Sequence, residues 1–171
     1  MAEQGHALRA TTRSEQGRAA IEACGAECWI GTPDRLATLR GALDNVTIAC
    51  WMLAGAHGER DEVAALHSSR LQFFLTQAID TTVRGFVYDA WPAGDSPRAG
   101  VSPQMLAGGE QIVRSLAQLN AIPVAVLDAE AAGGGGAGAA DGFASEGGGA
   151  EDRWLAAASA AVDSLLGTDT R

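Results

Sequence analysis

The sequence contains no lysine, so its 12 basic residues are all arginines. This absence excludes chemistry that depends on a lysine side chain, such as Schiff-base formation, a phosphate-loop lysine or a Tyr-x-x-x-Lys pair. Acidic residues number 21, and the net charge of −9 produces a field that repels nucleic acids and anionic membrane surfaces. We therefore expect neither a nucleic-acid partner nor a membrane partner.

The chain also has few cysteines and no long apolar run. Cys24, Cys28 and Cys50 match no zinc or redox spacing, which predicts buried thiols in a reducing compartment. His57 and His67 lack the spacing of a helical metal-binding pair, so we expect no metal site and place both in a solvated loop and helix start. No stretch approaches the roughly 20 apolar residues of a membrane span, and no signal peptide is recognisable. These absences predict a cytoplasmic protein.

What the sequence does contain is a regular alternation of short apolar runs and helical stretches. The apolar runs predict strands at residues 7–12, 27–31, 46–53, 83–88 and 123–127. N-cap residues and helical spacing predict helices at residues 14–24, 32–43, 60–79, 102–119 and 152–166. This order is typical of an α/β fold with a doubly wound, mostly parallel sheet of about five strands. The run at 46–53 is the longest, which places it near the sheet centre.

A change in composition divides the chain into three parts. Residues 131–150 are largely glycine and alanine, which have little to bury and much conformational entropy to lose, so we predict a flexible linker there. Residues 1–130 would form the α/β domain. Residues 151–171 would form an amphipathic helix and tail, with the helix docked on the sheet or, as the alternative, on a partner.

Residues 5–56 carry short motifs around three of the predicted strands. Gly5-His6 precedes the first of these strands, Thr12-Arg13 ends it, and "GAE" precedes the second. "GALDNVTIA" leads into the third strand, which ends in a turn of small residues. This pattern resembles the second to fourth strands of the atypical or extended short-chain dehydrogenase/reductases, the NAD-dependent epimerase/dehydratase group. Residues 83–90 resemble the fifth strand.

The resemblance implies a Rossmann-like fold that binds NAD or NADP. It also implies that the chain starts inside the helix after the family's first strand, because residues 2–6 look like a helix end closed by Gly5. The first strand and the GxxGxxG turn that holds the cofactor pyrophosphate would then be missing. We expect poor cofactor binding, with strands 7–12 and 46–53 either paired directly or separated by a borrowed strand. The exposed edge also allows homo-oligomers.

The resemblance assigns cofactor contacts to Thr12, Arg13, Thr32, Leu53, Ala54 and Gly55. Arg13 stands where the family places a cation over the adenosine 2′-phosphate, which favours NADP over NAD, and a solvated loop arginine is the alternative. Thr12 would help with ribose or phosphate, or would only be a β-branched strand residue without such a role. Thr32 replaces an aspartate near the adenine ring, and capping the next helix explains it better. Leu53-Ala54-Gly55 would pass over the adenosine, or would only close a strand.

No catalytic residue is assigned. The family uses a tyrosine followed four positions later by a lysine, but Tyr88 is the only tyrosine and Pro92 stands four positions after it. We expect the Tyr88 ring to be packed and its hydroxyl to be in water. The sequence thus favours an NAD(P)-binding protein without this catalysis, which if active would be an oxidoreductase or epimerase-like enzyme. The alternatives are a non-enzymatic nucleotide-sensing or interaction module, and a truncated fragment that binds no cofactor.

Overall fold

The computed structural model describes residues 5–91, 100–128 and 149–168. Its strands are β1 (Arg9–Thr12), β2 (Glu27–Ile30), β3 (Ile48–Trp51), β4 (Gly85–Asp89) and β5 (Val124–Leu127). Its α-helices are α1 (Arg18–Ala23), α2 (Arg60–Leu66), α3 (Ser69–Ile79), α4 (Pro103–Asn120) and α5 (Ala150–Thr168). The described 3-10 turns are η2 (Glu15–Gly17), η3 (Leu36–Leu39) and η4 (Gly41–Leu43). Each predicted apolar run overlaps a strand, and β4 extends one residue beyond its run, to Asp89, so the α/β class is confirmed.

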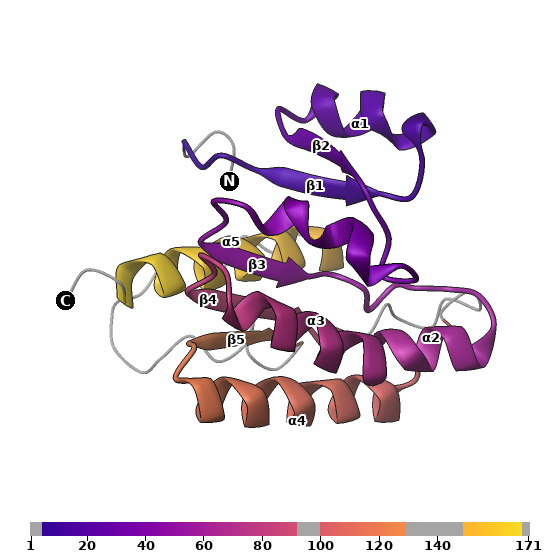
Figure 1. The fold of residues 1–171 in the computed structure, drawn as a ribbon, viewed down its shortest axis with the longest axis vertical. Helices are drawn as coiled ribbons and strands as arrows, with labels where there is room; N and C mark the ends of the chain where they lie inside the picture. The colour runs from indigo at the N-terminus through magenta and orange to yellow at the C-terminus, as the bar shows by residue number, and fades with distance from the viewer. Residues whose placement is uncertain (1–4, 92–99, 129–148, 169–171) are drawn as a thin grey trace.

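The strands form two parallel sheets instead of the single sheet expected from the sequence. β1 pairs with β2, and β3, β4 and β5 pair in that order. Figure 1 shows the strands stacked as β2, β1, β3, β4 and β5, with β1 and β3 pointing the same way. No ladder joins β1 to β3 within the described residues. The direct pairing of these two strands, one of the expected outcomes, is therefore wrong.

The central strand of the larger sheet is β4 and not β3. All five residues of β4 are buried, and the strand has a parallel neighbour on each edge. β3 pairs with β4 alone, and Cys50 on it is exposed. The central placement of 46–53 is wrong because an apolar run indicates helices over the strand's faces, whereas a central position needs strands on both edges. Cys24 is also exposed, so the prediction of buried thiols fails there too.

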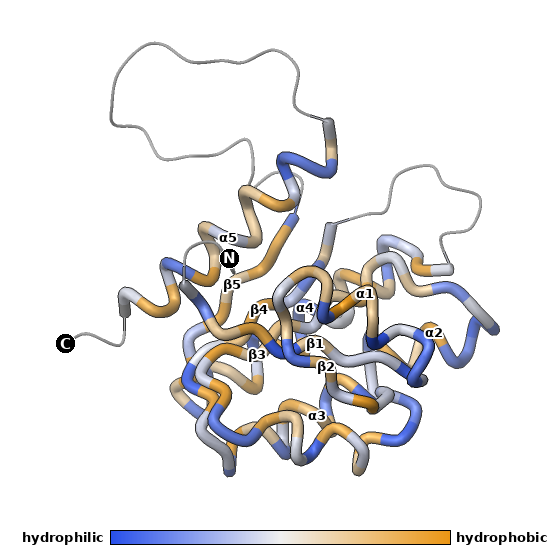
Figure 2. The backbone as a smooth tube through the Cα atoms, turned by 90° about the horizontal axis from the view of Figure 1, so that it is seen from above, coloured by the Kyte–Doolittle hydropathy of each residue, from blue (hydrophilic) through white to orange (hydrophobic). Residues whose placement is uncertain are grey.

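Two apolar clusters cover opposite faces of the larger sheet. The first lies against α3 and α4 and includes Trp51, Phe74, Phe86, Tyr88 and Val113. The second joins β4 and β5 to α5 and includes Val87, Leu127, Ala158, Val162 and Leu165. Successive residues of β4 enter different clusters because neighbouring strand side chains point to opposite faces. Figure 2 shows the apolar colour along β4 and β5 beside α5, and the expected docking of the C-terminal helix on the sheet is confirmed.

The helix expected at 32–43 is replaced by the two 3-10 turns η3 and η4. Arg35 and not Thr32 precedes the first turn, so Thr32 caps no α-helix. The turns lie tightly against β2: a Cβ on Gly31 would stand 2.8 Å from Leu39 Cδ2 and 2.9 Å from Thr38 O. Packing against Gly31, at the end of β2, has therefore overridden the local helical spacing.

Two other predictions concern element boundaries. The start of α4 is confirmed, because Ser102 Oγ accepts from the backbone N–H of Met105 at 3.3 Å and a proline occupies the first turn. The helix expected at 60–79 is interrupted between α2 and α3. Residues 2–4 and most of the expected linker at 131–150 lie outside the described residues, so the division of the chain into three parts stays a prediction.

Arg9 links the two sheets. Its Nη1 donates to the backbone oxygens of Ala42 at 2.8 Å and Asp44 at 2.9 Å, shortly before β3. The same guanidinium pairs with Glu27 at 2.9 Å and lies 5.8 Å from the centroid of the Trp29 ring. These contacts hold the sheets together near the ends where their strands begin, without a shared ladder.

Candidate functional site

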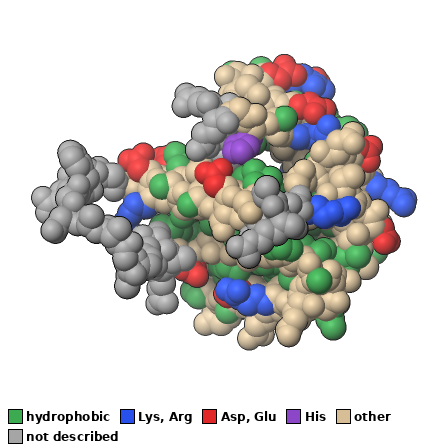
Figure 3. Space-filling view, turned by 90° about the vertical axis from the view of Figure 1, so that its left-hand side faces the viewer, with side chains coloured by type: hydrophobic (Ala, Val, Ile, Leu, Met, Phe, Trp, Pro, Cys, Tyr) green, Lys and Arg blue, Asp and Glu red, His purple; other side chains and the backbone are tan. Residues whose placement is uncertain are grey.

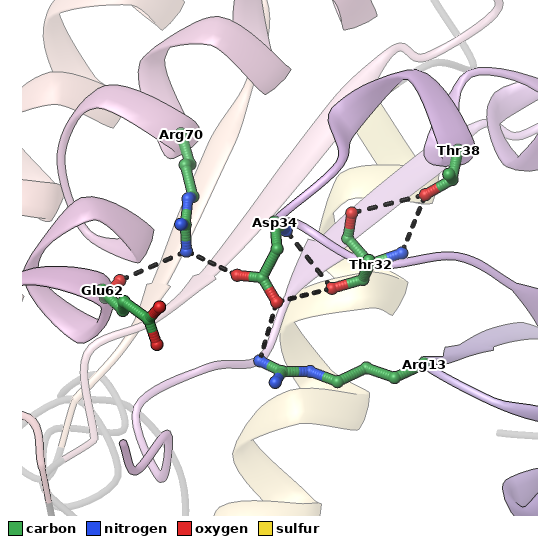
Figure 4. Close-up of polar contacts among 6 residues, drawn as sticks. All are labelled: Arg13, Thr32, Asp34, Thr38, Glu62 and Arg70. Carbon is green, nitrogen blue, oxygen red and sulfur yellow. Dashed lines mark hydrogen bonds and ion pairs between the residues drawn. The ribbon is translucent and has the colours of Figure 1, made fainter. Parts of the chain in front are cut away.

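A group of polar side chains lies beyond the carboxyl ends of β1 and β2 (Figure 4). Asp34 is at its centre: Oδ1 accepts from Arg70 Nη1 at 2.6 Å, and Oδ2 accepts from the Thr32 hydroxyl at 3.0 Å. Arg13 Nη2 lies 3.4 Å from the same Oδ2. Arg13, Thr32, Asp34 and Arg70 are called the Asp34 cluster below.

Three elements supply the Asp34 cluster. Arg13 directly follows β1, and Thr32 and Asp34 follow β2, so the parallel pairing of these strands brings all three to one edge. Arg70 comes from the start of α3 and also donates to the backbone oxygen of Glu62 at 3.3 Å. The second contact fixes the Arg70 guanidinium from the side of α2.

The Asp34 cluster contains two guanidinium groups and one carboxylate, so it is locally positive in a chain whose net charge is −9. The side chain of Arg13 is 67% exposed, whereas that of Arg70 is 23% exposed. An ion pair as exposed as the one between Arg13 and Asp34 contributes only about 0–1 kcal/mol. Arg13 can therefore leave Asp34 for another anion at little energetic cost, while Arg70 stays in place.

The turn after β3 carries Leu53, Ala54 and Gly55. Ala54 is 3% exposed, and its backbone N–H donates to the carboxylate of Asp89. The backbone oxygen of Leu53 lies 3.2 Å from His67 Nε2. A Cβ on Gly55 would meet nothing within 4 Å, so the space over this turn is open.

A buried polar chain holds Leu53 in position. The Tyr88 hydroxyl lies 2.8 Å from His67 Nδ1, and Nε2 of the same ring faces Leu53 O. Because a carbonyl oxygen only accepts, we assign the proton to Nε2. Nδ1 then accepts from the Tyr88 hydroxyl at 2.8 Å, in preference to Leu106 O, which lies 3.3 Å from the same hydroxyl. Burial lowers the pKa of His67 and raises the pKa of Tyr88, so both are uncharged at neutral pH. The expectations of a solvated His67 and a water-exposed Tyr88 hydroxyl are both wrong.

Asp89 connects three elements at the carboxyl end of the larger sheet. It ends β4 and is 6% exposed. Its Oδ1 accepts from the backbone N–H of Trp91 at 3.1 Å and from Trp154 Nε1 on α5 at 3.2 Å, and the backbone N–H of Ala54 donates to this carboxylate from the turn after β3. Burial raises the pKa of this carboxyl, and the three N–H donors oppose the rise.

The structure brings together two of the six predicted contact residues. Arg13 and Thr32 meet through Asp34. The Thr12 hydroxyl donates to a nearby residue in the chain, the backbone oxygen of Ser14, at 3.4 Å. Among the described residues, no hydrogen bond or ion pair connects the turn at 53–55 to the Asp34 cluster.

Sequence reasoning missed Asp34, Arg70, His67 and Asp89. Asp34 follows Thr32-Pro33, and this turn-forming triplet was a usable signal for a polar residue at a strand end. Arg70 lies 36 residues further along the chain, and only the tertiary fold brings it to Asp34.

Three further observations limit the kinds of site. Within the described parts of the chain, no group of three or more His, Cys, Asp or Glu side chains is placed to hold a metal ion. None of the described helices combines the length and apolarity that a membrane crossing requires. On the face shown in Figure 3, arginine side chains are dispersed among acidic ones and form no single basic patch.

Several solved structures have a similar fold. Triphenylmethane reductase from Citrobacter sp., complexed with NADP(H), is 18% identical, with a TM-score of 0.51 over 70% of this chain and 39% of that one. The protein gox2253 is 19% identical, with a TM-score of 0.57 over 74% and 44%. A short-chain dehydrogenase/reductase superfamily protein from Agrobacterium tumefaciens with bound NAD is 21% identical, with a TM-score of 0.55 over 74% and 42%. No protein-family model and no curated protein matches the chain.

These similarities show the fold. The chain has part of the Rossmann-type α/β fold of these structures, and it spans 39% to 44% of the length of the three described. The predicted fold class is thereby confirmed. The split between β1 and β3 falls where the sequence resemblance placed the missing strand. The narrower relationship to the epimerase/dehydratase group stays a prediction.

Proposed function

We propose that this chain forms the adenosine-binding part of an NADP site of the short-chain dehydrogenase/reductase type. The observation that carries the proposal is the Asp34 cluster, which contains an exposed guanidinium, that of Arg13, directly beyond the end of β1. In open parallel α/β sheets, ligands bind outside the carboxyl ends of the strands. Leu53, Ala54 and Gly55 follow β3 at the same end, and a Cβ on Gly55 would meet nothing within 4 Å, so no neighbouring side chain blocks the approach of a ligand to this glycine. The pyrophosphate contacts are assigned to none of the described residues.

Two members of the Asp34 cluster favour different cofactors. Arg13 would form a charge-assisted bond with the 2′-phosphate of NADP, which contributes about 1.5–3 kcal/mol. Asp34 would repel that phosphate and would accept from the ribose hydroxyls of NAD. However, Asp34 is already bound by Arg70 at 2.6 Å and Thr32 at 3.0 Å, whereas Arg13 is held only at 3.4 Å and is largely in solvent. This difference favours NADP.

We propose no Tyr-x-x-x-Lys catalysis by these residues. The only tyrosine, Tyr88, directs its hydroxyl to His67 in the core, and the sequence has no lysine. A substrate reaction, if present, would be that of an NAD(P)-dependent oxidoreductase or epimerase-like enzyme using other groups. A non-enzymatic nucleotide-sensing module is the second candidate, and the buried Tyr88 hydroxyl favours it. The epimerase/dehydratase relationship, the cytoplasmic location and the domain boundaries at 130 and 151 are proposed from the sequence alone.

Arg13→Ala is expected to weaken binding of 2′,5′-ADP by about 10- to 100-fold, because the variant loses one charge-assisted bond to the 2′-phosphate. Binding of 5′-AMP, which lacks that phosphate, should stay unchanged. Asp34→Asn should strengthen binding of 2′,5′-ADP, since it removes the carboxylate beside the phosphate. Isothermal titration calorimetry on the full chain measures all these affinities.

The matched control is Arg114→Ala, which removes the same charge from α4, where Arg114 pairs with Glu110 at 2.7 Å. It should leave both affinities unchanged. Equal losses in the Arg13 and Arg114 variants would show a long-range charge effect and contradict the proposed contact, as would a folded chain that does not bind 2′,5′-ADP. Oxidation of NADPH by the chain with any member of a carbonyl panel would reject the sensing module.

A further inference from the structure

One peptide unit of the turn after β3 is bound at both of its polar atoms by buried side chains. Its oxygen, that of Leu53, accepts from His67 Nε2 at 3.2 Å. Its N–H, that of Ala54, donates to the carboxylate of Asp89. His67 is 2% exposed and Asp89 is 6% exposed, so bulk water competes little for either contact. We call these two contacts, of His67 and Asp89 with the peptide between Leu53 and Ala54, the peptide clamp.

The turn keeps one main-chain donor that is available to a ligand. The backbone N–H of Ala56 donates to Leu53 O at 3.0 Å and closes a four-residue turn. Both lone pairs of Leu53 O are therefore used, and the peptide clamp binds the N–H of Ala54. The N–H of Gly55 has no acceptor among the described residues, and Gly55 is exposed. A ligand over the turn can thus accept from Gly55.

Both side chains of the peptide clamp are themselves held from behind. The Tyr88 hydroxyl lies 2.8 Å from His67 Nδ1, and Trp154 Nε1 of α5 donates to Asp89 at 3.2 Å. Tyr88 and Asp89 are neighbours in β4, and all five residues of this strand are buried. The peptide clamp therefore connects the turn to the central strand of the larger sheet and preorganises the turn before a ligand binds.

The peptide clamp is an expensive arrangement for stability alone. Taking an imidazole ring and a carboxylate out of water costs free energy that hydrogen bonds return only in part. The pKa shifts record this cost, because burial lowers the pKa of His67 and raises the pKa of Asp89. Two buried titratable groups that converge on one peptide beside an exposed turn are typical of a site whose geometry matters for binding.

We propose that His67 and Asp89 are positioning residues of the nucleotide site, because the peptide clamp holds the turn in the conformation that offers the Gly55 N–H to the adenosine. This inference rests on the proposed function. It divides the site into two parts: Arg13 binds the 2′-phosphate, and the clamped turn binds the part that 5′-AMP and 2′,5′-ADP share. Without the peptide clamp the turn must be ordered on binding, and ordering one residue weakens affinity by about 5- to 30-fold.

His67→Gln and His67→Asn separate the peptide clamp from the rest of the buried polar chain. The glutamine amide nitrogen reaches the place of Nε2 and donates to Leu53 O, while the Tyr88 hydroxyl turns to its second acceptor, Leu106 O, at 3.3 Å. The shorter asparagine amide stands near the place of Nδ1, so it accepts from Tyr88 but does not reach Leu53 O.

The two His67 variants should therefore differ in nucleotide affinity. We expect His67→Gln to bind 5′-AMP and 2′,5′-ADP within about twofold of the unsubstituted chain. We expect His67→Asn to bind both nucleotides about 5- to 30-fold more weakly, whereas Arg13→Ala weakens only the binding of 2′,5′-ADP. Titrations of the folded full chain, followed by NMR amide shifts, measure these affinities.

Two further comparisons serve as controls. Asp89→Asn keeps an oxygen for the Ala54 N–H and should retain affinity, whereas Asp89→Ala should lose it; this pair suffices if a His67 variant fails to fold. Val83→Ala removes buried methyl groups just before β4 begins, at the end of the sheet away from the turn. It should lower Tm and leave both affinities unchanged.

The possible results distinguish the peptide clamp from the nucleotide site itself. A folded chain that binds neither nucleotide would reject the proposed function and the positioning role together. Nucleotide binding that Arg13→Ala weakens, but that is equal in His67→Gln and His67→Asn, would leave the site in place and overturn the positioning role. Equal losses of affinity in His67→Asn and Val83→Ala would show an effect of stability alone and would also overturn it.

Discussion

Gly109→Ala is expected to lower the free energy of unfolding by about 1–3 kcal/mol, and by more if the helix cannot shift. A Cβ at this position of α4 would stand 2.0 Å from the Tyr88 hydroxyl oxygen and 2.7 Å from Cζ of the same ring. Tyr88 is fully buried and its hydroxyl is held by His67, so the ring has no free space into which to move. Urea denaturation followed by tryptophan fluorescence measures the change.

Gly108→Ala is the matched control for this prediction. It introduces the same methyl group one position earlier in the same helix, where a Cβ meets nothing within 4 Å. Because alanine is a better helix former than glycine, this variant should gain up to about 1 kcal/mol of stability. Equal stability of the two variants would show that α4 does not pack on Tyr88 as described.

Asp89→Ala is expected to lower the free energy of unfolding by about 2–4 kcal/mol. Asp89→Asn should leave it nearly unchanged or raise it at pH 7. Alanine leaves Trp91 N–H, Trp154 Nε1 and Ala54 N–H without their acceptor, and each unsatisfied buried donor costs about 1–3 kcal/mol, partly recovered by relaxation. Asparagine keeps an acceptor oxygen and removes the buried charge. Thermal denaturation of both variants measures the difference.

The pH dependence of stability provides a second check on Asp89. Burial raises the pKa of its carboxyl in the folded protein above the ordinary 3.8, so the folded state binds this proton more tightly than the unfolded state does. Relative to Asp89→Asn, the unsubstituted chain should therefore gain stability as pH falls from the raised pKa toward 3.8, and should lose it as pH rises through the same range. A stability difference that does not change with pH, or changes in the opposite direction, would refute the raised pKa.

Local sequence signals predicted where the strands and most of the helices lie, but they did not predict which residues pack around them. The Ser102-Pro103 pair predicted the start of α4 because N-capping by the Ser102 side chain and the presence of proline in the first turn both act within one helical turn. The helix expected from residue 32 failed because Leu39 packs against Gly31, the residue after β2, and helical spacing carries no information about that contact. His67 was placed in water because nothing in its neighbourhood indicates Tyr88, 21 residues away.

The candidate site was predictable only in part. Arg13 was predicted from the family resemblance, which places a cation directly after this strand. Its neighbour Asp34 was missed, and the Arg70 contact that holds Asp34 spans 36 residues. The burial of Asp89 depends on Trp154 of α5, 65 residues later, so no pattern around residue 89 predicts it. Residue spacing in the sequence does not predict interactions that form only in the packed fold.

We propose that an adenosine 2′-phosphate binds at the carboxyl ends of β1, β2 and β3. The most direct test is a titration of the isotope-labelled full chain with 2′,5′-ADP, followed by backbone amide chemical shifts. We expect the largest shifts at Thr12, Arg13, Thr32, Asp34 and residues 53–55, and we expect Arg13→Ala to remove most of them. Saturating shifts confined to other parts of the folded chain, or no shifts at millimolar 2′,5′-ADP, would contradict the proposal.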